Sequence, residues 1–507
     1  MATKRSKRAS KTSPARSGRR GKARAAAAEA KPKGVVNAWE QDPGDGAQPS
    51  GGQVIQRPVP VLREQPFSIR IVNPASAPEA KPHSPGTADF RYWTAAEALR
   101  RGADFWGALL PGTSWEVGSI LPVDLDFGID LNAFYDREGL KFFHGSAAGR
   151  TVFSGESPDV VCHELGHAIL DSLKPQLFDA ASIEVAAFHE SFGDMSALLS
   201  ALQLPSLREE VLAETSSHVD RSSRLSRLAE QLGWAVRQNH PDEVDSDCLR
   251  NASNSFFYTD PVDLPPSAPA SSLSSEPHSF SRVFTGAFLN ILAAMFAVQT
   301  KLGSAGLLAA ARDAATILVG GVQATPVVPS FYSQVAAHML AVDAADFGGR
   351  YREALKGGFV RHGILSMQAA TVPPPPKERA GAAGIFELVA PGVENEPLAR
   401  IALPAMHLGL QEELLVSAAS QPKRFAVGSA AADLGSSVAR GHDFVAASFL
   451  EDLARRGRID FNGHAVAGAA VLAPRALKTH EVVRERAQLV LVRRRVDCGH
   501  GCSTLVP

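Results

Sequence analysis

The chain has 507 residues, of which 45% are hydrophobic and 21% are charged, and its formal net charge is −1. This composition is ordinary for a soluble globular protein, and it excludes a fibrous chain. The longest apolar runs, at 286–299 and 307–323, predict buried helices, because the first is too short to span a bilayer and the second contains Arg312 and Asp313. We therefore expect no membrane partner.

The N-terminal arm is strongly basic. Residues 1–33 contain twelve Lys and Arg and one acidic residue, Glu29, and residues 34–60 continue as a Gly-, Pro- and Gln-rich stretch. No apolar segment of a signal peptide follows the charges, and the four cysteines are few and scattered, so we expect a cytoplasmic protein. A disordered tail and linker over 1–60 is the simplest interpretation, and nucleic-acid binding through this arm is the alternative.

A β-rich N-terminal lobe is predicted over residues 61–180. A strand is expected at 67–72, and a helix from an N-cap at Thr94 to Leu110. Two strands around the turn DREG are expected within 131–145, and another at 149–153. The segment VVCHELGHAILD, residues 160–171, then predicts a helix that begins near Pro158.

A helical lobe is predicted over residues 181–365. A helix is expected at 182–202, and three apolar helices within 279–364. A Pro-rich linker at 366–381, which contains four consecutive prolines, separates this lobe from a small α+β extension at 382–507, whose role the sequence does not indicate. In the extension we expect a helix over 443–456 that Gly457 ends. Its expected strands are 385–389, 424–427 and 488–496.

The sequence HELGH places two imidazoles on one face of a helix. His163 and His167 have the spacing of a zinc-binding pair, and Glu164 lies where it can reach a metal-bound water without being a ligand. A hydrolytic zinc site needs a third protein ligand and one open position. Glu190 is the candidate third ligand, and Asp194, one helical turn later, can orient a ligand imidazole.

Taken together, HELGHAILD and ESFGD resemble the thermolysin-like gluzincin metallopeptidases. The resemblance covers about residues 88–365. LNAFYDREGLKFFHG is similar to the edge strand of that family, CLRNASN to its substrate-arginine segment, and EPHSFSRVFTGAF to its catalytic-histidine segment. DVVCHE and LKGGFVRHGIL are similar to the approach to the metal helix and to the closing helix. The resemblance implies an α+β, two-lobe metallopeptidase with the zinc helix between the lobes.

This resemblance also implies roles for individual residues. One Zn²⁺ per chain would be held by His163, His167 and Glu190, with Glu164 as general base. His278 would stabilise the oxyanion, and Arg250 would hold the carbonyl on the leaving side. Asn132 and the backbone of Ala133 would pair with a peptide or protein substrate by strand addition.

Two features depart from the family pattern. Phe178 stands where the family has an oxyanion-binding tyrosine, so that donor is either missing or supplied by Tyr258. Calcium is not expected, because residues 195–207 contain no carboxylate and Asp159 alone cannot provide the six to eight oxygens that calcium needs.

Three competing hypotheses remain on the sequence alone. A catalytically impaired binding module would explain Phe178, but it gives no reason to keep Glu164. A structural zinc module fits less well, because three ligands leave an open position. The third is a nucleic-acid-associated protein that acts through its basic arm. CGHGC at 498–502 could chelate a metal through its two cysteines and its histidine, but we expect a flexible terminus there.

Overall fold

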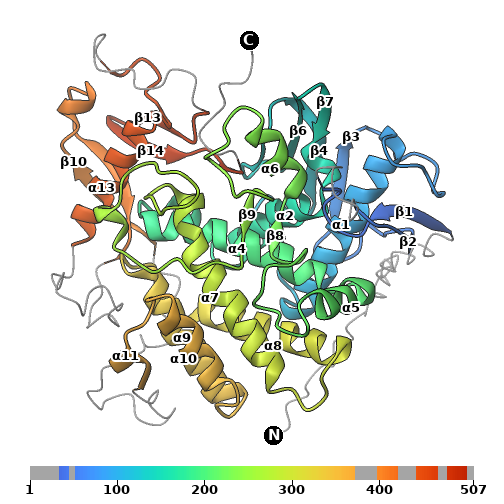
Figure 1. The fold of residues 1–507 in the computed structure, drawn as a ribbon. Coiled ribbons are helices and arrows are strands. Elements are labelled where there is room, and N and C mark those ends of the chain that lie inside the picture. Colours follow the sequence, from blue (N-terminus) through green and yellow to red (C-terminus); the bar gives the residue numbers. More distant parts are fainter. Residues whose placement is uncertain (1–33, 45–51, 372–396, 421–440, 466–476, 499–507) are drawn as a thin grey trace, which may run out of the picture. The chain divides into compact units, whose positions relative to one another are not determined.

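The computed structural model describes residues 34–44, 52–371, 397–420, 441–465 and 477–498 (Figure 1). The predicted basic arm lies outside these residues, as do the strands expected at 385–389 and 424–427 and most of CGHGC. All of these described residues belong to one compact unit by their contacts. Within the described residues, helices and strands are mixed along the chain, which confirms the α+β class.

Two strands form where the sequence predicted a linker. β1 (Val35–Trp39) and β2 (Val54–Pro58) pair as an antiparallel ribbon, so the prediction of disorder is wrong for these residues. The ribbon is fixed to the first helix, because the Trp39 N–H donates to Thr94 Oγ1 at 3.2 Å and the Trp39 ring meets Phe90 edge to face. Long-range packing, rather than local propensity, therefore orders this ribbon.

Helix α1 (Ala88–Leu109) begins earlier than predicted. Its N-cap is Thr87, whose hydroxyl oxygen accepts from the Phe90 N–H at 3.2 Å, whereas the predicted cap, Thr94, lies inside the helix. The six residues before Thr94 continue the helix because Phe90, Tyr92 and Trp93 are buried against the core. Tertiary burial thus outweighs the weak helix propensity of aromatic residues.

The strands of the N-terminal lobe belong to one six-stranded sheet. Strands β3 (Ile69–Asn73), β4 (Leu121–Ile129) and β6 (Leu140–Ala147) are parallel neighbours, and β5 (Ala133–Tyr135) and β7 (Arg150–Phe153) pair antiparallel to β6. These strands confirm the predictions at 67–72, 131–145 and 149–153. The sixth strand, β15 (Val496–Asp497), comes from the C-terminal extension and covers the outer edge of β5.

The middle of the chain is helical. Helix α2 (Pro158–Leu173) carries HELGH and α4 (Ile183–Ala201) carries ESFGD, both as predicted. The region 279–364 contains four helices rather than the three expected. The elements between residues 174 and 371 are α3 (Gln176–Asp179), α4, α5 (Pro205–Glu214), β8 (Arg227–Leu228), α6 (Glu230–Arg237), β9 (Arg250–Asn251), α7 (Pro277–Ala297), α8 (Ser304–Ala324), α9 (Phe331–Asp346), α10 (Arg352–Arg361) and α11 (Met367–Thr371).

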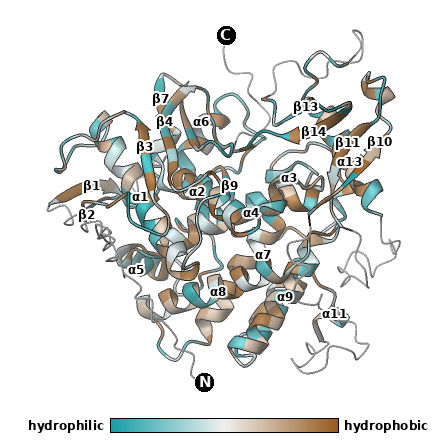
Figure 2. Cartoon of the chain, turned by 180° about the vertical axis from the view of Figure 1, so that it is seen from behind, coloured by the Kyte–Doolittle hydropathy of each residue, from teal (hydrophilic) through white to brown (hydrophobic). Residues whose placement is uncertain are grey.

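Helices α7 and α8 are long and apolar enough to cross a membrane by length and composition alone. In this structure, however, 78% of the most apolar window of α7 and 61% of that of α8 are buried inside the protein. Hydrophobic and hydrophilic stretches alternate along α8 and α9 (Figure 2), as is usual for core helices with one face toward solvent.

The C-terminal extension forms a second sheet, in the order β10-β11-β14-β13-β12. Its core includes Phe449 and Leu450 of the helix α13 (His442–Arg455), together with Ile183 and Ala186 of α4. Gly457, with φ of 65°, lies just after α13 as predicted. The extension is therefore packed against the start of the helix that carries Glu190. Its strands are β10 (Ala399–Leu403), β11 (Leu414–Ala418), β12 (Ile459–Asp460), β13 (His480–Glu485) and β14 (Gln488–Arg493).

Candidate metal centre

Three side chains from α2 and α4 converge as the sequence predicted. The ligand atoms of His163, His167 and Glu190 all lie within 4.8 Å of one another, and all three side chains are buried. Glu190 Oε2 is 3.3 Å from His163 Nε2 and 3.8 Å from His167 Nε2. A tetrahedral zinc site with bonds of about 2.0–2.1 Å separates its ligand atoms by about 3.4 Å. The observed separations are thus close to those of a metal site.

The three ligand atoms are also left without hydrogen-bond partners. Nε2 of both histidines and Oε2 of Glu190 are buried and have no hydrogen-bond partner among the residues that the structure describes. Leaving buried polar atoms in this state is unfavourable, by about 1–3 kcal/mol for each group. A divalent metal ion would satisfy all three at once, so the residues fit the ion that the sequence predicted.

The other nitrogen of each histidine is held from behind. Nδ1 of His163 lies 3.0 Å from Asp194 Oδ1, and Nδ1 of His167 lies 3.0 Å from Nδ1 of His189. Both contacts turn the Nε2 atoms toward Glu190. The role of Asp194 was predicted, but that of His189 was missed. The sequence offered one indication of this role: His189 directly precedes Glu190, and consecutive residues on a helix lie on adjacent faces.

The two helices approach closely because glycines line their crossing. A Cβ atom added at Gly193 would lie 2.6 Å from the His163 ring, and one added at Gly166 would lie 2.7 Å from the Ser196 Cβ. Neither position has room for a side chain. Gly166, which interrupts the apolar helix sequence, is therefore required for this packing.

Arg250 and Asp194 form a buried ion pair behind His163. The Arg250 Nη2 donates to Asp194 Oδ1 at 2.9 Å, and both residues are at most 3% exposed. Burial would raise the pKa of Asp194, but the Arg250 guanidinium and His163 hold it well below its usual range. Arg250 Nε and Nη1 have no hydrogen-bond partner in the described part of the chain. The side chain thus retains donors for a further acceptor, as its predicted role requires.

The protonation states of the two histidines differ. Burial lowers the pKa of His167 well below its usual range, which keeps this imidazole neutral as a metal ligand must be. Burial also lowers the pKa of His163, but the hydrogen bond to Asp194 and the nearby Glu190 carboxylate outweigh it and raise the value to about 9. A metal ion would have to displace this proton in order to bind.

Glu164 lies beside the ligands and is fully buried. Burial raises the pKa of its carboxyl to about 8, against the opposing effect of the His163 charge. Its Oε1 accepts a hydrogen bond from the Cys498 Sγ–H at 2.7 Å, whereas Oε2 has no partner within the described ranges. The carboxyl therefore has one free oxygen next to the candidate metal ligands.

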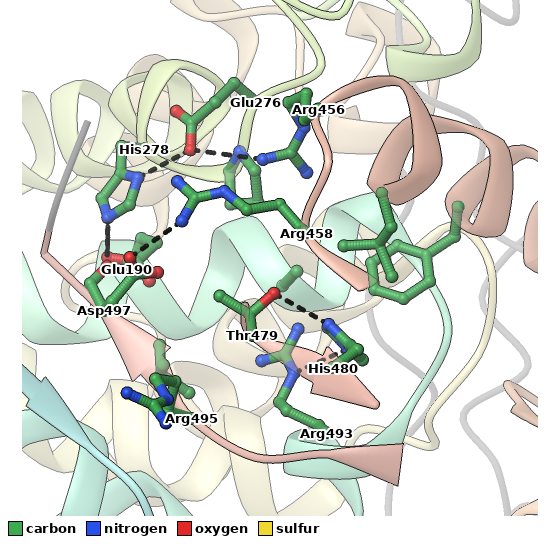
Figure 3. A pocket seen from close by; sticks show the side chains of 15 residues that line it. Glu190, Glu276, His278, Arg456, Arg458, Thr479, His480, Arg493, Arg495 and Asp497 are labelled. Carbon is green, nitrogen blue, oxygen red and sulfur yellow. Dashed lines mark hydrogen bonds and ion pairs between the residues drawn. The ribbon is translucent and has the colours of Figure 1, made fainter. Parts of the chain in front are cut away.

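His278, at the start of α7, also reaches this centre (Figure 3). Its Nε2 lies 3.2 Å from Glu190 Oε2 and 2.5 Å from the Asp497 carbonyl oxygen, and its Nδ1 lies 2.7 Å from Glu276 Oε1. Burial lowers the pKa of His278, but the Glu190 and Glu276 carboxylates outweigh it and raise the value to about 9. With acceptors at both nitrogens, this imidazole is a hydrogen-bond donor toward the centre.

The predicted substrate strand is present as β5, but its partner is part of the same chain. The Ala133 carbonyl accepts from the Cys498 N–H at 2.9 Å. Asn132 is buried, and its Oδ1 accepts from the Ala133 N–H at 2.8 Å, so this side chain contacts its own strand. The contribution of Cys498 was not predicted.

Phe178 and Tyr258 occupy separate environments. Phe178 packs beside His189, with ring centroids 6.3 Å apart, and the Arg137 guanidinium lies 4.2 Å from the centre of its ring. The Tyr258 hydroxyl lies 2.5 Å from Glu184 Oε1. Because this hydroxyl is already engaged, the suggestion that Tyr258 replaces the missing oxyanion donor is not supported.

No protein-family model matches the sequence, and no curated protein matches it. Function therefore has to be inferred from the chemistry of the site itself.

Proposed function

We propose that the protein is a zinc-dependent metallopeptidase. The proposal is carried by one observation: three buried ligand atoms without hydrogen bonds converge beside the carboxyl of Glu164. Two histidines and one glutamate are a known ligand set of catalytic zinc, and they leave a position open for water. When bound there, zinc would polarise a carbonyl group and lower the pKa of a water molecule.

The chain's own residues supply the remaining chemistry. Glu164 would take the proton of the attacking water and pass it to the leaving amine. His278, which carries donors on both ring nitrogens, would stabilise the oxyanion, and Arg250 would bind the carbonyl on the leaving side with its unpaired donors. Loss of one oxyanion donor typically lowers turnover by about 100-fold or more.

The proposed substrate is a peptide or protein segment in extended form. Strand β5 lies at an edge of the five N-terminal strands, so an added peptide could pair with it through main-chain hydrogen bonds. Such pairing depends little on side chains. We further propose that residues 61–180 and 181–365 form the two lobes of a thermolysin-like fold, in keeping with the order of the five similar sequence segments.

A catalytically impaired binding module is the second candidate. The observation that favours it is the apolar Phe178 beside His189, together with the engagement of Tyr258 by Glu184. The hypothesis of nucleic-acid binding concerns residues 1–33 and stays a prediction. It requires binding that weakens steeply with salt and disappears when these residues are deleted.

Glu164→Gln separates the peptidase from the binding module. The amide is nearly isosteric but cannot accept the water proton, so cleavage of a mixed peptide library should fall by about 100-fold or more while zinc content stays unchanged. Glu184→Gln is the matched control, because Glu184 is also on a helix and buried, and burial likewise raises its pKa to about 8.

The control should cleave at the parental rate. Equal rates for Glu164→Gln and the parent would mean that another group activates the water. The binding module would be favoured if neither the zinc-loaded parent nor its Cys498 variants cleave any peptide.

A further inference from the structure

The last described residues of the chain add a strand to the candidate substrate edge. Val496 pairs with Tyr135 and Asp497 with Phe134 in antiparallel register, and the Cys498 N–H continues the ladder to the Ala133 carbonyl. An extended peptide that adds to an exposed sheet edge makes the same type of main-chain pairing. The segment Val496–Cys498 therefore lies where the proposed substrate would bind.

This segment also contacts the two residues proposed for acid–base and oxyanion chemistry. The Asp497 carbonyl oxygen is 2.5 Å from His278 Nε2, and the Cys498 thiol donates to Glu164 Oε1. A substrate carbonyl would need the first donor, and an attacking water would need the second group. His278 Nε2 and one of the two Glu164 oxygens are thus already engaged, and Asp497 and Cys498 are themselves buried.

The thiol is close enough to the metal ligands to interfere with metal chemistry. Ligand atoms of His163, Glu164 and Cys498 form a second group within 4.8 Å of one another. Independently, the buried Nε2 of His163 has no hydrogen-bond partner among the described side chains and backbone groups. Cysteine sulfur is a strong zinc ligand. The sulfur therefore lies within 4.8 Å of ligand atoms of His163 and Glu164 at the candidate metal centre.

The C-terminal extension fixes the segment in place. Arg458 Nη1 donates to Asp497 Oδ2 at 3.1 Å, and Arg458 is only 3% exposed (Figure 3). The cavity that remains between His278, Glu190 and the C-terminal sheet has a volume of about 30 Å³. That space is large enough for a water-sized molecule. The segment is thus held in the centre by specific buried contacts.

We propose that Val496–Cys498 is an internal inhibitor, which occupies the substrate edge of β5 and covers Glu164 with the Cys498 thiol. This inference rests on the proposed peptidase function and assigns a regulatory role to the C-terminal extension. The site opens when the segment leaves β5. No oxidant is required, because withdrawal breaks only hydrogen bonds, and the thiol keeps its proton.

A graded pair of variants tests the inhibitor. Cys498→Ala removes the thiol but keeps the N–H that pairs with Ala133, whereas Cys498→Pro removes both. Peptide cleavage should rise by up to about tenfold in the first, as expected for losing one hydrogen bond, and further in the second. Cys502→Ala is the matched control, because it removes the other cysteine of CGHGC and should leave the rate unchanged.

Two further measurements do not depend on turnover. A dipeptide hydroxamate, which can chelate zinc and pair with β5, should bind zinc-loaded Cys498→Ala about tenfold more tightly than the parent by calorimetry. In the parent it should also accelerate alkylation of Cys498 by iodoacetamide, measured by mass spectrometry, because it displaces the segment. Circular dichroism verifies that the variants fold.

These outcomes separate the inhibitor from the peptidase. Equal hydroxamate affinity in the parent, Cys498→Ala and Cys498→Pro overturns the inhibitor, as does an absence of binding in all three. Cleavage that is present but unchanged in the variants overturns it too, while the peptidase stands. If the variants bind the hydroxamate more tightly but no protein cleaves peptide, the peptidase function is overturned. The conclusion that Val496–Cys498 occupies the edge of β5 then stands.

Discussion

Asp194→Asn should weaken metal binding and destabilise the metal-free protein for two separable reasons. The asparagine keeps the shape of the side chain but removes the charge that faces Arg250 at 2.9 Å and His163 at 3.0 Å. Removing one partner of a buried ion pair typically costs about 3–5 kcal/mol, because the other charge stays buried and uncompensated. Losing the partner that orients a ligand histidine typically costs 10–100-fold in metal affinity.

The double variant Asp194→Asn/Arg250→Met separates the two effects. It removes the unpaired guanidinium, and replacement of a buried pair by apolar side chains is often nearly neutral. Urea unfolding with a chelator present should therefore show a loss of about 3 kcal/mol or more for the single variant, with at least half of it recovered in the double variant. Zinc affinity, measured by competition with a chromophoric chelator, should be reduced in both.

Two results would refute this reasoning. If the double variant is no more stable than Asp194→Asn, the destabilisation does not come from the uncompensated Arg250 charge. If both variants bind zinc within twofold of the parent affinity, the contact between Asp194 and His163 does not orient a metal ligand.

Other predictions concern the metal, calcium and pH. Metal analysis should find about one zinc per chain, and a His163→Ala protein with undiminished zinc would contradict the ligand set. A calcium-selective chelator, at concentrations that leave zinc bound, should not change the thermal midpoint, because residues 195–207 contain no carboxylate. Burial raises the pKa of Glu184 from 4.5 to about 8, so above about pH 4.5 the folded protein keeps a proton that the unfolded chain loses. Its stability should fall between about pH 5 and pH 8, by up to about 1.4 kcal/mol per unit, and Glu184→Gln should show a flatter profile in urea titrations; parallel profiles would contradict the assignment.

The predicted metal ligands come together because their placement depends on helical periodicity. His163 and His167 share a face of α2, and Glu190 and Asp194 share a face of α4, so two local patterns and one helix crossing build the centre. The ribbon of β1 and β2 had no such local signal. Its Gly- and Pro-rich surroundings indicated a linker, and only packing on α1 orders it.

The contacts of the C-terminal segment could not be predicted from any local pattern. Cys498 and Glu164 are separated by 334 positions, and a two-residue strand such as β15 has too few residues to show an alternation of polar and apolar side chains. The strand was expected to continue from 488 to 496, whereas β14 ends at Arg493 and the chain enters a different sheet at Val496.

Gly166 and Gly193 set a condition on transplanting this centre into another protein. Copying the ligands His163, His167 and Glu190 onto an arbitrary pair of helices would fail if alanine stood at the crossing, because the added Cβ would collide with Ser196 or with the His163 ring. The helices would then separate, and the glutamate would no longer reach both imidazoles. A search for distant relatives should therefore require HExGH followed by ExxGD, because the two glycines allow the close spacing of the helix backbones.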